Sequence, residues 1–248
     1  MGKQGKLTKD LMQSTMPVDA PAYHEKPFIY KGANIYAFQY ETDEETARGL
    51  LPEQLSLTDT PTATLAFIEY DQSSLGPYRE ITLSIDSVYE GEQIPYLAYL
   101  FLDEDVPILA GREVYGFPKK KALIEFTRQE DVLGMYAERP RGIRICSGVM
   151  RDEMVFSPME AGSAVSQIVL RAIPSPEENT RHSLLELVKV DYIIEKGEMS
   201  FGPGNCSFPG ESELDPWHRL PVRKMLLCTH MSFNGTLAYG KILANLLE

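Results

Sequence analysis

Apolar and polar residues alternate with a period of about two along much of this chain, in segments rich in β-branched and aromatic residues. These segments lie at 33–41, 62–70, 78–90, 95–104, 122–151, 183–202 and 223–233. The pattern predicts strands with one buried face. Within the longest segment, the polar groups QED and RPRG predict turns.

Three other segments predict short helices. Residues 42–55 carry acidic residues in the first turn, with Thr42 or Asp43 available as the N-cap. Residues 106–117 have a proline near the start and a glycine near the end, as helices often do. The closing segment, 237–248, is the third predicted helix.

The order of these elements predicts the fold class. Strands dominate, no unit repeats at a fixed period, and no low-complexity linker divides the chain. We therefore expect a single β-rich α+β domain over residues 1–248, built on a large antiparallel sheet or closed β-barrel with a few flanking short helices. Residues 1–27 are polar and rich in proline, and they predict an N-terminal arm that wraps rather than packs.

Composition narrows the possible partners. The 248 residues carry a formal net charge of −12, which argues against nucleic acid and against an anionic membrane surface. An anionic substrate would need a local cluster of positive charge. The three cysteines, the polar N-terminus and the lack of a long apolar run predict a cytoplasmic protein. No nucleotide, metal or serine-nucleophile motif appears, so we expect no cofactor and no metal.

One segment gathers basic residues where the chain has few. Lys119, Lys120 and Lys121 follow Pro118 and stand between the apolar stretches VYGF and ALIEF. The simplest interpretation is a solvated charge run. The alternative is a reactive amine, which must lose its proton although an ordinary lysine has a pKa of about 10.4. Desolvation and nearby like charges both favour the neutral amine.

Strand geometry restricts how these lysines can influence one another. In a regular strand Lys119 and Lys121 point to one face and Lys120 points to the other. A direct effect of Lys120 on Lys119 therefore requires an irregular backbone, which Pro118 permits. If the strand is regular, desolvation is almost the only effect that can favour the neutral amine.

The lysine segment GREVYGFPKKK (111–121) resembles that of the acetoacetate decarboxylase family, in which Gly-Arg-Glu precedes an aromatic residue and Pro-Lys-Lys. The resemblance extends over most of the chain. The other matching segments are STMPVDAPAY (14–23), YETDEETARGLLPEQL (40–55), SSLGPYRE (73–80), FLDEDVPILAGRE (101–113), LRAIPSP (170–176) and LPVRK (220–224).

The resemblance implies roles for four residues. Lys119 matches the lysine that forms a Schiff base in the family, and Lys120 matches the partner to which tuning of the amine's pKa is assigned. Glu80 matches a carboxylate near the amine, which would transfer protons or position the substrate, although a solvated strand glutamate is the alternative. Phe117 matches an aromatic residue of the substrate pocket.

Two positions depart from the family pattern. Ala33 and Leu65 stand where the resemblance expects an arginine and a second glutamate of the substrate pocket. If the register is shifted, Glu69 or Arg79 is the alternative for these roles. The departure indicates that the polar groups around the substrate are remodelled while the amine is retained.

The resemblance implies a Schiff-base lyase that decarboxylates a small β-keto acid such as acetoacetate to acetone and carbon dioxide. Two alternatives stay open. One is an aldolase-dehydratase that condenses pyruvate with an aldehyde through a lysine enamine, and the other is a non-catalytic member that binds a small ligand. The family and the N-terminal arm also predict a homo-oligomer.

Overall fold

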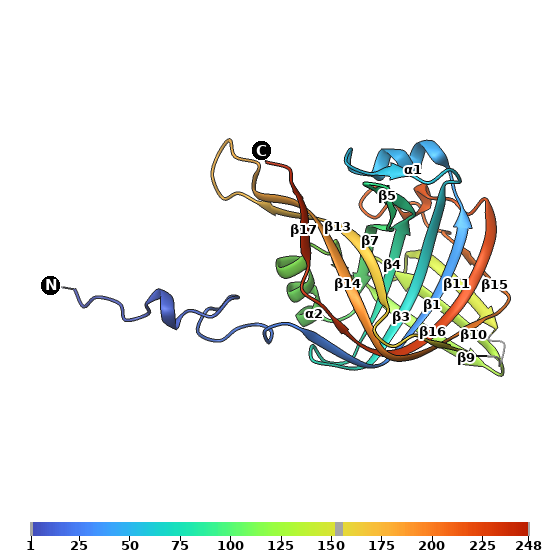
Figure 1. Ribbon diagram of the computed structural model, residues 1–248, viewed down its shortest axis with the longest axis horizontal. Coiled ribbons are helices and arrows are strands. Elements are labelled where there is room, and N and C mark those ends of the chain that lie inside the picture. Colours follow the sequence, from blue (N-terminus) through green and yellow to red (C-terminus); the bar gives the residue numbers. More distant parts are fainter. Residues whose placement is uncertain (1, 152–155, 248) are drawn as a thin grey trace.

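A closed barrel of seven strands forms the body of the molecule (Figure 1). In order around the barrel the strands are β14 (His182–Phe201), β13 (Ala164–Pro174), β7 (Tyr96–Leu102), β4 (Tyr78–Ile85), β3 (Thr62–Ser73), β1 (Phe28–Glu41) and β16 (Lys224–Leu237). Pairing of β14 with β16 closes the ring. Neighbours are antiparallel except β13 and β7, which are parallel, so the barrel is mixed. The computed structural model describes residues 2–151 and 156–247.

A smaller sheet packs against one side of the barrel. It contains β15 (Gly204–Ser207), β11 (Arg144–Arg151), β10 (Val132–Glu138) and β9 (Leu123–Gln129). The hydrophobic cluster between this sheet and the barrel includes Phe38, Phe67 and Ile81. A second cluster inside the barrel includes Tyr70 and Tyr78. Successive side chains of a strand point to opposite faces, so β1, β3 and β4 supply both clusters.

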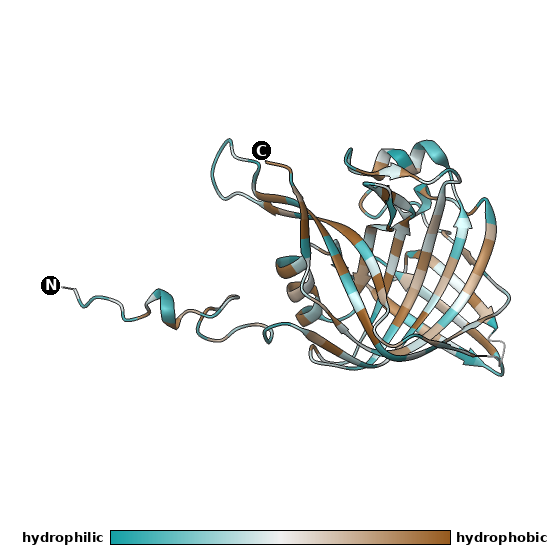
Figure 2. Cartoon of the chain, viewed as in Figure 1, coloured by the Kyte–Doolittle hydropathy of each residue, from teal (hydrophilic) through white to brown (hydrophobic). Residues whose placement is uncertain are grey.

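Short strands complete the sheets. The strands β2 (Ser56–Leu57), β5 (Ser87–Tyr89) and β6 (Glu92–Gln93) form a three-stranded sheet. The strand β8 (Lys119–Lys121) pairs in parallel with β7. The strands β12 (Ser157–Met159) and β17 (Lys241–Asn245) pair with β14. The brown and teal bands along the barrel strands in Figure 2 show the alternation from which the strands were predicted.

The helices are short. The N-cap of α1 (Glu44–Leu50) is Asp43, whose carboxylate accepts a hydrogen bond from the amide of Thr46 at 3.0 Å. The helix α2 (Asp105–Ala110) continues into one π-helical turn, η2 (Gly111–Tyr115). Single 3₁₀ turns are η1 (Lys9–Leu11) and η3 (Trp217–Arg219).

A glycine ends the helical segment that precedes the lysines. Gly116 has φ of 84°, a left-handed conformation that favours glycine, and a Cβ there would collide with the backbone of Arg171. The chain therefore turns sharply at Gly116 and enters β8. The π-helical turn η2 and the sharp turn at Gly116 together place Lys119 next to β7.

The arm, residues 2–27, is mostly exposed and lacks regular structure apart from η1. In Figure 1 it runs away from the barrel. It is attached where the hydroxyls of Thr15 and Tyr23 each donate to Oε2 of Glu113 at 2.7 Å. Whether it wraps a neighbouring subunit stays a prediction.

The β-rich barrel with few short helices is confirmed, and the helices predicted at 42–55 and 106–117 are present in shorter form. The helix predicted at 237–248 is wrong, because residues 241–245 form β17. Pairing with β14 outweighs the local helix propensity of this segment. The strand β13 was not predicted. No helix in the described ranges is long and apolar enough to cross a membrane.

Candidate active site

The side chain of Lys119 is buried beside a carboxylate. Lys119 begins β8 and is 5% exposed, and Glu80, on β4, is 2% exposed. The Nζ atom of Lys119 lies 3.1 Å from Oε2 of Glu80. The rings of Phe117 and Tyr78 flank the amine, with centroids 5.3 and 5.6 Å from Nζ. An amine and a carboxylate that lie far apart in the sequence thus meet inside the fold.

Two residues of the Gly-Arg-Glu motif hold this lysine in place. Gly111 leaves the space that the lysine occupies, since a Cβ on Gly111 would lie 2.5 Å from Cε of Lys119. The guanidinium of Arg112 donates from Nη1 to the carbonyl oxygen of Lys119 at 3.1 Å. Glu113 accepts the two hydrogen bonds from the N-terminal arm. The motif therefore connects the arm, the helical turn and the lysine strand.

The three lysines approach three different carboxylates. The strand β8 is regular, so Lys120 points away from Lys119, and its Nζ donates to Oδ1 of Asp215 at 2.8 Å. Nε of Arg139 lies 3.1 Å from Oδ2 of the same buried carboxylate. Lys121 pairs with Asp105 at 2.7 Å. The ammonium of Lys120 is thus directed at Asp215 rather than toward the amine of Lys119.

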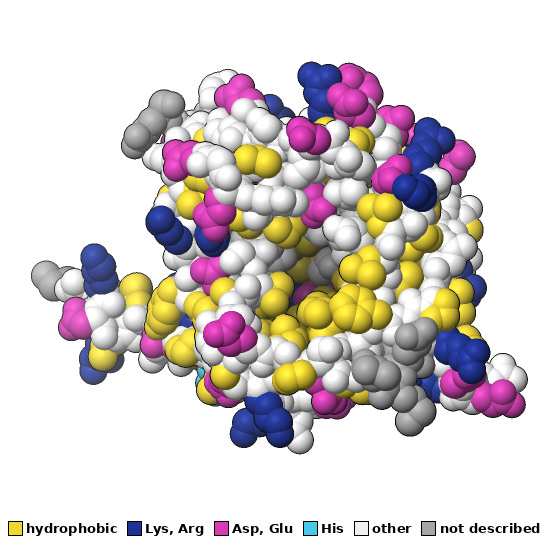
Figure 3. Space-filling view, turned by 45° about the vertical axis from the view of Figure 1, so that its right-hand side comes forward, with side chains coloured by type: hydrophobic (Ala, Val, Ile, Leu, Met, Phe, Trp, Pro, Cys, Tyr) yellow, Lys and Arg dark blue, Asp and Glu magenta, His cyan; other side chains and the backbone are white. Residues whose placement is uncertain are grey.

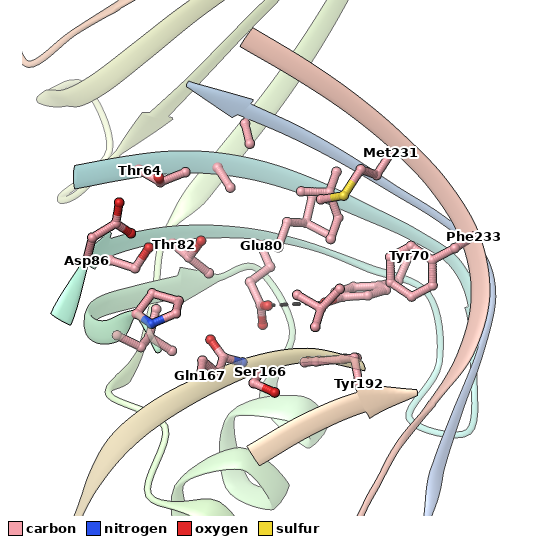
Figure 4. Close-up of a pocket in the computed structure, with 18 residues that line it drawn as sticks. Thr64, Tyr70, Glu80, Thr82, Asp86, Ser166, Gln167, Tyr192, Met231 and Phe233 are labelled. Carbon is pink, nitrogen blue, oxygen red and sulfur yellow. Dashed lines mark hydrogen bonds between the residues drawn. The ribbon is translucent and has the colours of Figure 1, made fainter. Parts of the chain in front are cut away.

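A cavity of about 200 Å³ lies inside the barrel, with Glu80 in its wall. Figure 4 shows Glu80 pointing into it from β4, with residues of β13 on the opposite side. Lys119 lies behind the carboxylate rather than in the wall. On the face drawn in Figure 3, hydrophobic side chains gather around a hollow in the surface. A ligand in the cavity therefore meets Glu80 first and the amine next to it.

Buried tyrosines surround the carboxylate. The hydroxyl of Tyr70 donates to Oε1 of Glu80 at 3.4 Å, and the hydroxyl of Tyr78 donates to that of Tyr30 at 3.3 Å. Burial raises the pKa of Tyr70, Tyr78 and Tyr192 well above the usual value, and the charge of Glu80 raises each further. These hydroxyls therefore stay protonated at neutral pH, and Tyr70 remains a hydrogen-bond donor to Glu80.

The predicted pocket residues separate in the structure. Phe117, expected in the substrate pocket, flanks the amine but does not line the cavity. Ala33 is fully buried in the same cluster as Tyr70, its strand partner, but does not line the cavity. Leu65 belongs to the cluster on the outer side of the barrel, because odd-numbered residues of β3 point away from the cavity. The expectation that Leu65 lines the pocket is corrected by this placement.

The proposed substitutes for the missing polar groups do not reach the cavity. Glu69 and Arg79 lie on neighbouring strands, and Nε of Arg79 is 3.5 Å from Oε1 of Glu69. Burial raises the pKa of Glu69. Neither residue lines the cavity, and no lysine or arginine of residues 2–151 and 156–247 does so. The cavity wall therefore offers a bound anion no cationic side chain other than the amine behind Glu80.

Several site residues were not predicted from the sequence. Tyr70, Tyr192 and Gln167 line the cavity, and Gly111 makes room for the lysine. The Gly-Arg-Glu motif contains Gly111, but no pattern in the sequence indicates its role. Tyr70 is on the same face of its strand as Ile68, which an alternation count identifies once the inner face is known. In the described part of the chain, no three His, Cys, Asp or Glu side chains come together as a metal site.

Comparison with known families agrees with this geometry. The buried amine, the adjacent carboxylate and the cavity inside the barrel together form the candidate active site. The family model described as acetoacetate decarboxylase matches residues 15–247, and the chain belongs to that family. The decarboxylase DEC1 of Cochliobolus heterostrophus is 29% identical over 235 residues, which are 91% of this chain and 92% of that protein. The acetoacetate decarboxylase of Ralstonia nicotianae is 28% identical and covers 94% of both.

Solved structures share the fold over nearly the whole chain. The acetoacetate decarboxylase of Legionella pneumophila has a TM-score of 0.83 at 25% identity and covers 100% of both chains. A second acetoacetate decarboxylase structure has a TM-score of 0.86 at 22% identity, covering 98% of this chain and all of its own. The enduracididine biosynthesis enzyme MppR complexed with pyruvate has a TM-score of 0.75 at 17% identity, covering 94% and 97%. Family and relatives support a decarboxylase, a carbon–carbon lyase.

Proposed function

We propose that this chain decarboxylates a small β-keto acid such as acetoacetate, giving acetone and carbon dioxide, through an imine on Lys119. The observation that carries the proposal is the contact of Nζ of Lys119 with Oε2 of Glu80 beside a cavity in the barrel. The family membership supports the same reaction class. The amine supplies the electron sink that a cofactor supplies in other lyases.

The pair itself provides a route to the neutral amine. Two opposite charges buried together pay a large desolvation cost. Transfer of the ammonium proton from Lys119 to Glu80 removes both charges at once and leaves a neutral amine and a neutral carboxylic acid. The rings of Phe117 and Tyr78 add to the desolvation. The proton stays within the pair and is available for later steps.

The reaction follows from these two groups. Nζ of Lys119 attacks the ketone carbon, and Glu80 returns its proton to the hydroxyl that leaves as water, forming a protonated imine. The bond between the carboxylate carbon and its neighbour then breaks. Its electron pair moves to the iminium nitrogen, carbon dioxide leaves, and an enamine remains. Protonation of the enamine carbon and hydrolysis by water release the ketone and the free amine.

The charge distribution of the cavity favours loss of the carboxylate. No lysine or arginine of the described ranges lines the cavity to stabilise the substrate's negative charge. Decarboxylation removes this charge, because the electron pair neutralises the iminium and carbon dioxide is uncharged. An apolar site therefore destabilises the bound anion more than the transition state, which has already dispersed the charge.

Lys120 is assigned a supporting role in this proposal. Its ammonium binds Asp215 on the other face of β8, so its charge does not act on the amine by direct contact. Arg139 forms a second ion pair with Asp215. We infer that Lys120 holds β8 against the segment before η3 and does not act on the amine of Lys119 directly.

Borohydride trapping tests the imine directly. The native protein is incubated with acetoacetate, reduced, digested and sequenced by tandem mass spectrometry. We expect an isopropyl adduct on Lys119, no adduct in Lys119→Ala, and a retained adduct on Lys119 in Lys121→Ala. Release of carbon dioxide should be lost in Lys119→Ala alone. An unmodified Lys119 with acetoacetate turned over by the native protein would refute the imine mechanism.

Two other readouts separate the remaining alternatives. If acetoacetate is inert while pyruvate plus an aldehyde yields a condensed enone acid, and reduction traps pyruvate as a 1-carboxyethyl adduct on Lys119, the chain is an aldolase-dehydratase. If neither substrate is turned over or trapped although both bind, the chain is a binding member of the family. Both results would overturn the decarboxylase proposal.

A further inference from the structure

The cavity is long rather than round. Glu80, Thr82, Ser84 and Asp86 all line it, although they extend over the seven residues 80–86. A strand advances by about 3.3 Å per residue, so the wall from Glu80 to Ser84 is about 13 Å long. A volume of about 200 Å³ spread over that length makes a narrow channel. Such a channel accommodates an extended chain better than a compact molecule.

The neighbouring strands β3 and β1 continue this wall, with their inward residues level with those of β4. Inward residues of β3 and β4 form three successive pairs, Ile68 with Glu80, Ala66 with Thr82 and Thr64 with Ser84. On the next strand, Ala37 is the partner of Ala66. The level next to Glu80 is thus built of small side chains, Ala37, Ala66 and Thr82, and this is why the channel stays open there.

The two ends of the channel differ. Tyr70, Tyr192 and Phe233 close one end and are 3%, 9% and 4% exposed. Ser166 and Gln167 lie toward the other end, opposite the row that leads from Glu80 to Asp86, and both are partly exposed (Figure 4). The reacting carbon sits near Glu80, so any further part of a substrate extends toward this second end.

Charge restricts what that further part can be. Asp86 stands at the outer end of the row, where its Oδ2 accepts a hydrogen bond from Nε2 of Gln39 at 3.0 Å. Glu80 stands at the inner end. The carboxylate of Asp86 therefore repels a second negative charge at the outer end of the ligand. Between these carboxylates the wall carries Ala37, Ala66 and Leu97 together with the uncharged hydroxyl residues Thr64, Thr82 and Ser84.

We propose that the preferred substrate is a 3-oxo acid with an unbranched, uncharged acyl chain of about eight to ten carbons, whose tail lies between β3, β4 and β13. This inference rests on the proposed lysine decarboxylation and names its substrate class. Acetoacetate would occupy only the inner part of the channel.

The tail supplies binding energy that the cavity cannot obtain from the carboxylate. No cationic side chain of the described residues lines the wall, so a four-carbon substrate has few favourable contacts there. Each methylene moved from water into an apolar channel strengthens binding by about fourfold. Binding energy from the unreactive tail also offsets the desolvation of the carboxylate that is lost in the reaction.

A chain-length series tests the proposal with the native protein. The kcat/KM for carbon dioxide release is measured for acetoacetate and for the 3-oxo acids of six, eight, ten and fourteen carbons. We expect a rise of about fourfold per methylene, levelling off near ten carbons. A 3-oxo diacid of eight carbons should react at least tenfold more slowly than the monoacid of equal length.

Variants that narrow the channel provide a second test. Ala37→Phe places a ring at the level next to Glu80, and Ala37→Leu is the milder variant if the first does not fold. In both variants the ratio of kcat/KM for the ten-carbon acid to that for acetoacetate should fall at least tenfold. Ala161→Phe, in an exposed turn that does not line the cavity, is the matched control and should keep the native ratio.

The outcomes are distinct. A flat or falling series, together with a borohydride adduct on Lys119 from acetoacetate, overturns the tail proposal and leaves the decarboxylase proposal standing. An equal loss for all chain lengths in Ala37→Leu also overturns it. Absence of turnover and of trapping with every acid overturns both proposals.

Discussion

At the scale of single residues, the contact between Lys119 and Glu80 decides what the cavity can do. The carboxylate lines the cavity and the amine lies behind it, so a substrate reaches the amine past a group able to hold one proton. The hydrogen bond from Tyr70 fixes the other oxygen of Glu80 and leaves Oε2 directed at the amine. The proposed reaction needs both the amine of Lys119 and the carboxylate of Glu80.

Replacing Glu80 by glutamine keeps the shape and removes the proton acceptor. We expect kcat for decarboxylation to fall by about 10²–10⁴-fold, the range typical of general acid–base groups. Carbon dioxide release under saturating substrate measures this. Glu69→Gln is the matched control, because Glu69 points away from the cavity and pairs with Arg79. Equal losses in the two variants would show that Glu80 acts only through stability.

Replacing Lys120 by methionine tests whether its charge acts on the amine. Because the Lys120 ammonium binds Asp215 on the opposite face, we expect the pH profile of kcat/KM to keep its acidic limb in place. Stability should fall by only about 1 kcal/mol, since Lys120 is partly exposed and Arg139 still pairs with Asp215. A shift of the acidic limb by more than half a pH unit would assign the tuning role to Lys120 after all.

At the scale of elements, the turn that joins α2 to β8 is built around the lysine. The π-helical turn η2 brings Gly111 against the side chain of Lys119, and Arg112 binds the carbonyl of the same residue. Glu113 attaches the N-terminal arm to this turn. One element therefore sets the position of the amine and connects it to the arm.

Gly111→Ala places a methyl group 2.5 Å from Cε of Lys119 and must displace the amine. We expect kcat to fall by about 10²-fold, as a misplacement of about 1 Å can cause, and stability to fall by about 1–3 kcal/mol. Gly49→Ala in α1 is the control, since nothing lies within 4 Å of its added Cβ. That variant should gain up to about 1 kcal/mol and retain native activity.

Elements whose structure is set by a local sequence pattern could be predicted from the sequence. Elements whose structure is set by pairing with a distant strand could not. Alternation located β1, β3 and β4, and capping residues located α1. The closing segment has the composition of a helix but forms β17, because the edge of β14 offers it a partner. The same limit applies to the site. Family resemblance predicted Lys119, Glu80 and Phe117, but the inner face of β3, and with it the exclusion of Leu65, follows only from the closed barrel.

At the scale of the whole molecule, two hydrophobic cores share the strands of one sheet. The inner core contains several tyrosines, so the barrel hides many ionisable hydroxyls along with the cavity. Burial raises the pKa of Tyr40, Tyr70, Tyr78 and Tyr192 well above 10. Burial also raises the pKa of the Cys206 thiol to about 12. The native state therefore keeps protons that the unfolded chain releases in alkali.

This difference predicts a steep loss of stability at high pH. Below about pH 8.5 these groups are protonated in both the native and the unfolded state, so they do not lower the free energy of unfolding. Above that, first the thiols and then, near pH 10, the tyrosines ionise only in the unfolded chain. Each such group lowers the free energy of unfolding by up to about 1.4 kcal/mol per pH unit until its native pKa is reached.

Urea unfolding between pH 8 and 11, together with absorbance at 295 nm, measures this effect. We expect the free energy of unfolding to fall with increasing slope above pH 9, and most of the tyrosinate signal to appear only as the near-ultraviolet circular dichroism is lost. Tyr192→Phe removes one buried hydroxyl that lines the cavity and should make the slope above pH 10 shallower. Tyrosinate that forms fully while the native circular dichroism persists would mean that water reaches the inner core, and an amine buried beside it would lose the desolvation on which its reactivity depends.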